Sequence, residues 1–170
     1  MNSTSARVMA AFGLVLLLTG CGGARRVEGL PLQHGDIVIA KATIPEPPTN
    51  LGAAYLVIEN RGQQADRFLH AESEAAGVVE LHQTRMNGTA MTMVAIEYVE
   101  LPAGHTFDMD IGSFHLMLID LKRRLREGDR VPISLTFERA GTFTVSAQVI
   151  SATGVPSEPA APHGQHSATR

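Results

Sequence analysis

The sequence predicts an all-β domain built as a Greek-key β-sandwich or barrel. Two observations lead to this fold class. From about residue 35 onward, short apolar stretches with alternating side chains recur at close intervals, and glycine, proline and asparagine separate them. Helical periodicity is nearly absent over the same part of the chain. Roughly eight to ten short strands at this spacing are typical of sandwiches and small barrels.

Alternation and turn chemistry place the expected strands in chain order. The predicted strands are 36–43, 53–59, 66–72, 78–84, 91–98, 105–109, 114–121, 131–137 and 142–149. A stretch with three prolines, 44–52, is expected to be an irregular loop. Asn87-Gly88 is the strongest hairpin signal in the chain, because both residues tolerate positive φ. Strands 78–84 and 91–98 should therefore pair across it.

The first 20 residues are predicted to be a lipoprotein signal peptide. A polar start precedes an apolar run from Val8 to Leu18, which is too short to span a bilayer. The run leads into Leu18-Thr19-Gly20-Cys21, which looks like a bacterial lipobox with Cys21 as the lipidated residue. An ordinary secretory signal with a chance cysteine is the alternative, although the only cysteine of the chain stands where a lipobox needs it. The expected location is the extracytoplasmic face of a bacterial membrane, in the periplasm or at the cell surface, with acyl chains as the anchor.

The rest of the chain divides into a tether, one domain and a tail. Lipidated Cys21 and a flexible tether are expected over residues 21–34, a folded domain over 35–152, and a disordered tail rich in Pro, Ala, Ser and His over 153–170. His163 and His166 in the tail are a weak candidate for Cu(II) binding. The net charge is −3 and there is no basic stripe, so nucleic acid is not an expected partner.

Methionine and histidine are concentrated in the stretch from His82 to Met117. It holds five of the seven methionines and three of the seven histidines. Residues at i and i+2 of a strand share a face, about 7 Å apart. In the strand 114–121, the apolar side chains at 114, 116 and 118 therefore form one face, and His115 and Met117 form the other.

The Asn87-Gly88 hairpin adds further candidates for the same region. It would return Met91 and Met93 towards His82. Imidazole and thioether groups, without carboxylate or thiolate, favour Cu(I) over zinc, calcium or magnesium. A blue-copper electron-transfer site would need a cysteine thiolate, and the only cysteine lies in the leader. All the candidate ligands are neutral, which suits a carrier that releases its ion better than a permanent cofactor site.

In the spacing of these histidines and methionines, the chain resembles the periplasmic copper chaperone family PCu(A)C. Members of that family have a cupredoxin-like domain with the pattern H-(M)-x10-M-x21-H-x-M. His82, ten residues, Met93, twenty-one residues, His115 and then Met117 reproduce the pattern without a gap. The similarity covers about residues 35 to 150 and includes E-N-R-G, L-P-A-G and L-R-E-G-D-R-V-P-I-S-L-T-F. The proline-rich loop and the tail carry no such match.

The resemblance implies a cupredoxin-like fold and a chaperone for one Cu(I). Carried over position by position, its ligands are His82, Met93, His115 and Met117. Family members are linked to copper delivery towards cytochrome c oxidase, often alongside a Sco-like thioredoxin-fold partner. Met86 and Met91 are possible accessory residues, with packing as an equal alternative.

Two other functions stay open from the residues alone. One is a copper buffer or tolerance lipoprotein without a dedicated acceptor, and the other is a β-sandwich adhesion or assembly lipoprotein that binds no metal. No nucleophile–base pair, phosphate-binding loop or pair of catalytic acids is evident, so an enzyme is not expected. Met109 is expected to be structural, and His34, His70 and His105 are expected to be ordinary polar residues.

Overall fold

The structure is a computed structural model that describes residues 29–87 and 90–154 of the 170-residue chain. The predicted leader, Cys21, and the tail with His163 and His166 lie outside the described residues. Within them, the chain forms strands β1 (Leu32–His34), β2 (Ile37–Pro45), β3 (Gly52–Asn60), β4 (Asp66–Glu72), β5 (Ala76–Asn87), β6 (Ala90–Ala95), β7 (Val99–Leu101), β8 (Thr106–Asp108), β9 (Phe114–Leu121), β10 (Arg130–Phe137) and β11 (Gly141–Ile150), then a 3-10 turn, η1 (Ala152–Gly154).

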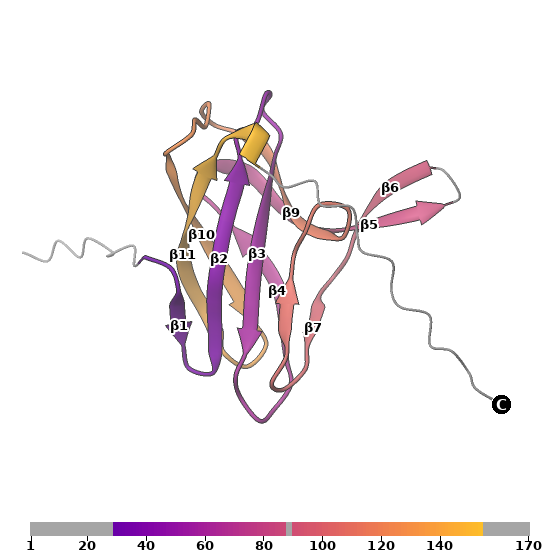
Figure 1. The fold of residues 1–170 in the computed structure, drawn as a ribbon, viewed down its shortest axis with the longest axis vertical. Coiled ribbons are helices and arrows are strands. Elements are labelled where there is room, and N and C mark those ends of the chain that lie inside the picture. Colours follow the sequence, from indigo (N-terminus) through magenta and orange to yellow (C-terminus); the bar gives the residue numbers. More distant parts are fainter. Residues whose placement is uncertain (1–28, 88–89, 155–170) are drawn as a thin grey trace, which may run out of the picture.

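The strands pair in the order β6-β5-β9-β3-β2-β11-β10-β4-β7, with β1 added to β2 and β8 added to β3. Strand β3 connects the β6-β5-β9 part of this sheet to the rest, because it pairs with β9 through Gly52–Ala54 and with β2 through Tyr55–Asn60. The β2–β11 pair is parallel. Figure 1 shows the hairpin β5–β6 projecting away from the body of the domain. The expected all-β fold is confirmed.

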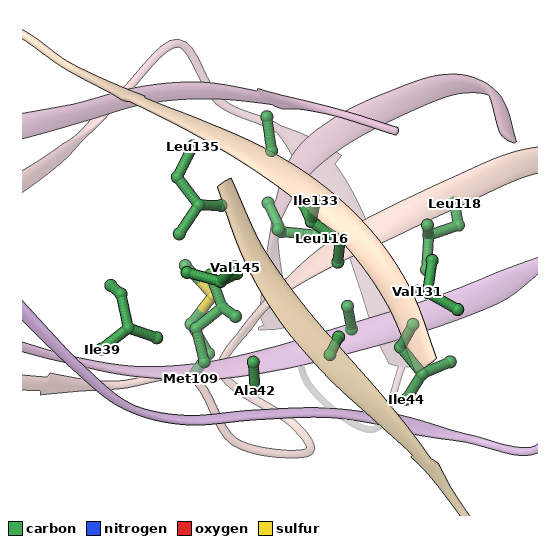
Figure 2. Close-up of a cluster of buried hydrophobic side chains, with 14 of the residues drawn as sticks. Ile39, Ala42, Ile44, Met109, Leu116, Leu118, Val131, Ile133, Leu135 and Val145 are labelled. Atoms are coloured by element: carbon green, nitrogen blue, oxygen red, sulfur yellow. The ribbon is translucent and has the colours of Figure 1, made fainter. Parts of the chain in front are cut away.

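The core follows from side-chain alternation along the strands. In β3, the inward residues Ala54, Leu56 and Ile58 are completely buried, while the residues between them are only partly covered. Leu116 and Leu118 of β9 enter the same cluster (Figure 2). Each fully buried leucine or isoleucine stabilises the fold by roughly 1.5–3 kcal/mol. The core therefore holds β9 in place and fixes which of its faces carries His115 and Met117.

Most predicted strands match the structure closely. The ranges 66–72 and 114–121 coincide with β4 and β9 residue for residue. Strands β2, β3, β5, β10 and β11 also correspond to predicted strands, with ends that shift by no more than three residues. The expected hairpin is present, because Asn87 pairs with Ala90 in the β5–β6 register.

The predicted strand 91–98 is wrong at its carboxyl end. Strand β6 ends at Ala95. The N–H of the next residue, Ile96, donates to the Leu81 carbonyl at 2.9 Å, at the end of the hairpin away from its turn. The chain then crosses to β4, where Val99–Leu101 forms the separate strand β7. Local alternation could not reveal this break, because its cause is burial of β7 side chains against a distant strand.

Two smaller differences concern short strands. Strand β1 pairs with β2 and was not predicted. The predicted strand 105–109 shortens to β8, after which Met109 packs into the core with 2% exposure. The structural role expected for Met109 is confirmed.

In the part of the chain that the structure describes, no helix has the length and apolar character needed to cross a bilayer.

Candidate metal centre

Strands β5 and β9 bring two candidate ligands directly opposite each other. His82 and His115 are register partners, and their ring centroids lie 5.6 Å apart. Met117 is the register partner of Glu80 in the same pair of strands. Directly opposite residues of an antiparallel pair project to the same face. Both imidazoles, Met117 and Glu80 therefore share one face of the sheet, opposite to the core.

Met93 joins this face through the hairpin. The β5–β6 register places Met93 opposite Thr84, two residues along β5 from His82. It is thus a diagonal neighbour of His82, at a separation that long side chains can bridge. Met91 lies opposite Met86, farther along the hairpin. The metal-binding role of all these residues stays a prediction.

The face is not uniformly open to solvent. His115 is only 3% exposed and the His82 side chain only 13%, whereas Met93 is 54% exposed. The ring of Tyr55, on neighbouring β3, lies 6.3 Å from the His115 ring and helps to cover it. The two imidazoles therefore form a sheltered inner part of the face, and the hairpin methionine lies at its exposed edge.

The hydrogen bonding of His82 leaves one ring nitrogen available. Its Nε2 lies 2.8 Å from Glu80 Oε2. An ionised carboxylate can only accept, so in the neutral imidazole Nε2 carries the proton and Nδ1 carries the lone pair. Nδ1 is buried and has no hydrogen-bond partner. An orphaned buried polar atom costs about 1–3 kcal/mol, and a bound metal ion would satisfy it. Metal-binding histidines commonly donate their other N–H to a carboxylate in this way.

The electrostatics favour neutral side chains around the imidazoles. Burial lowers the pKa of His115, and electrostatic repulsion between the neighbouring His82 ring and a protonated His115 lowers it further. Burial raises the pKa of Tyr55, with a contribution from the Asp110 carboxylate. His115 is therefore kept in the neutral form that a metal ligand requires, and the Tyr55 phenol remains protonated.

The lowered pKa of His115 predicts a pH dependence of stability. Between the usual histidine pKa of about 6.5 and the lower pKa of the folded state, the unfolded chain binds more protons at this site. The free energy of unfolding of the metal-free protein should therefore fall as the pH drops through this window. Urea unfolding across the window should show a shallower pH slope for His115→Gln than for the parent. Equal slopes for His115→Gln and the parent would contradict the prediction.

Two of the histidines predicted to be ordinary polar residues make contacts in other parts of the fold. His34 stacks on Phe143 at 4.6 Å, and His105 Nδ1 lies 2.8 Å from the Ala103 carbonyl. Between β9 and β10, Arg123 forms an ion pair with Asp129 at 2.7 Å. Among the described residues, no group of three or more His, Cys, Asp or Glu side chains could hold a metal ion. The candidate set is instead two imidazoles and two thioethers.

Sequence reasoning missed two neighbours of the imidazoles. Glu80 could have been found, because it stands at i−2 from His82 and strand alternation places both on one face. Tyr55 could not, because its proximity to His115 arises from the pairing of β3 with β9.

Comparison with known proteins identifies the family to which this chain belongs. The family described as putative lipoprotein LpqE-like matches residues 32–149. The chain belongs to this family. One relative is the putative lipoprotein Lxx21020 of Leifsonia xyli subsp. xyli, 28% identical over 148 residues that cover 84% of this chain and 88% of the relative.

Solved structures share the fold of this LpqE-like chain. The copper-bound PCuAC domain from PmoF2 superposes with a TM-score of 0.61 at 22% identity, covering 71% of this chain and 97% of that domain. The Cu(I) form of DR1885 from Deinococcus radiodurans gives a TM-score of 0.54 at 25% identity, covering 75% of this chain and 85% of that protein. The PCuAC-type, cupredoxin-like fold expected from the resemblance is confirmed.

Proposed function

We propose that this protein is an extracytoplasmic carrier of a single Cu(I) ion. The observation that carries the proposal is the buried, unpartnered Nδ1 of His82, on the same face as the ring of His115 and the thioether of Met117. Met93 would complete the ligand set from the hairpin. The copper-bound PCuAC domain and the Cu(I) form of DR1885 support the same cargo.

The chemistry of the four side chains suits transport of this ion. Thioether and imidazole are ligands that Cu(I) accepts, and none of them carries a charge when His115 and His82 are neutral. The complex keeps the single positive charge of Cu(I), with the Glu80 carboxylate close by. A thiolate-bearing acceptor would bind the ion more strongly, so transfer can proceed by ligand exchange without a redox step.

The proposed copper acceptor is based on the family resemblance, and the proposed membrane anchor is based on the lipobox. We assign Cys21 as the lipidated residue that holds the carrier at the membrane. The acceptor would be the copper centre of cytochrome c oxidase, reached directly or through a Sco-like thioredoxin-fold protein. The protein would act as a chaperone and not as an enzyme.

A Cu(I) competition titration tests the cargo. Under reducing conditions, the full-length protein should withdraw one tightly held Cu(I) from a chromogenic chelator, because two sheltered imidazoles and two thioethers converge on one face. The chelator absorbance reports the stoichiometry and the affinity. Failure to withdraw any Cu(I) would sink the proposal and favour a structural lipoprotein. A second step separates a chaperone from a buffer, since only a chaperone should pass the ion to an oxidase copper domain or a Sco-like protein in a mixture followed by NMR.

A further inference from the structure

The hairpin β5–β6 carries a second group of sulfur atoms outside the sheltered imidazoles. Met86 and Met91 are direct register partners, and Met93 follows Met91 on the same face of β6. All three are well exposed, at 63%, 59% and 54%. They fill no gap in the core, so the packing alternative for Met86 and Met91 does not account for them.

The register brings these thioethers within reach of one ion. Directly opposite residues of an antiparallel pair have Cβ atoms about 4.5–5.5 Å apart, and a diagonal neighbour is still within reach of a long side chain. Methionine has three rotatable bonds and a polarisable sulfur, so the side chains can turn towards a common point. Soft thioether ligands select Cu(I) among the biological metals.

We infer that Met86 and Met91, with Met93, form an outer Cu(I) site at the exposed end of the same face. This inference rests on the proposed handling of Cu(I) and adds a place where the ion is bound before or after it occupies the inner ligands. Met93 lies between Met91 and the register level of His82, so it can serve either site. Movement between the sites breaks copper–sulfur bonds and forms copper–nitrogen bonds, with no electron transferred and no proton released from a neutral imidazole.

The order of exposure along the face supports this position. In the β5–β6 register the Met86–Met91 pair lies nearer the turn than Met93, and Met93 lies nearer the turn than the two sheltered imidazoles. An ion that arrives from solvent or leaves for an acceptor would meet these exposed thioethers before the imidazoles. Strand alternation also keeps these side chains on one face. His82 and Met86 are separated by an even number of residues along β5, as are Met91 and Met93 along β6, so all four project to the same side.

The test uses the full-length protein with carbon-13 in the methionine methyl groups and Cu(I) as the only probe. Once the first equivalent is bound, a second should shift the methyl signals of Met86 and Met91. Met86→Leu/Met91→Leu keeps the size and apolar character of both side chains but removes both sulfurs, and it should abolish binding of the second equivalent. Val94→Ala, on the other face of β6, should keep it. The inference is overturned if the leucine variant retains the second equivalent or if the methyl signals of the parent do not move.

A separate variant distinguishes this inference from the proposed function. His115→Ala/Met117→Ala removes two inner ligands, and Met86 and Met91 should then respond to the first equivalent. If the parent shows no tightly held first equivalent while these two methyl signals still shift, the inner-site proposal fails and the outer site stands. If only the inner site binds Cu(I), the reverse holds.

Discussion

Replacing His115 and Met117 together by alanine is expected to lower the Cu(I) affinity of the full-length protein by more than about a hundredfold, since loss of one outer-shell partner alone costs about 10–100-fold. His115 supplies one of two imidazoles that stand 5.6 Å apart, and Met117 lies on the same face of the same strand. Removing both leaves His82 without its cross-strand partner and deletes a thioether. Competition with a Cu(I) chelator measures the change.

Control variants distinguish the loss of copper ligands from a loss of folding in the double alanine variant. His115 is nearly fully buried, so alanine at this position leaves a cavity. Met117→Leu removes only the sulfur and keeps the packing, and it should weaken Cu(I) binding without a change in the urea midpoint. His70→Ala, on the exposed side of β4, should bind as the parent does. A double variant that competes for Cu(I) as well as the parent would refute the assignment of these ligands.

Strand alternation was enough to place His115 and Met117 on one face, because the period of two belongs to the backbone itself. The Asn87-Gly88 signal likewise predicted the hairpin that returns Met93 to the side of His82, since hairpin register depends on residues close in sequence. These parts of the fold and of the candidate site are local in origin.

What the sequence could not provide was the pairing between distant strands. The opposition of His82 and His115 depends on the β5–β9 register, and the shelter of His115 depends on Tyr55 from β3. The same limit explains the error at residues 96–98, where the chain leaves one strand to bury β7 against β4. Burial and strand register depend on contacts between residues that are far apart in the sequence, so local sequence patterns do not predict them.

Glu80 provides the second large expected effect, because it acts on the copper site through His82. Its carboxylate lies 2.8 Å from Nε2 and so favours the tautomer in which Nδ1 offers its lone pair. Glu80→Ala removes the acceptor, frees the ring to adopt the other tautomer and should lower the Cu(I) affinity about 10–100-fold. The competition titration used for the ligand variants measures this loss.

Glu80→Gln separates positioning from charge attraction. The glutamine side-chain oxygen can still accept from Nε2–H but carries no charge, so this variant should recover much of the affinity that Glu80→Ala loses. Nitrogen-15 NMR of the His82 ring in the metal-free protein gives an independent readout, with Nε2 protonated in the parent and in Glu80→Gln, and a mixture of tautomers in Glu80→Ala. If both variants lose the same affinity while the tautomer is unchanged, Glu80 acts by attracting the positive ion. If Glu80→Gln binds like the parent, the hydrogen bond to His82 is what prepares Nδ1 for the metal.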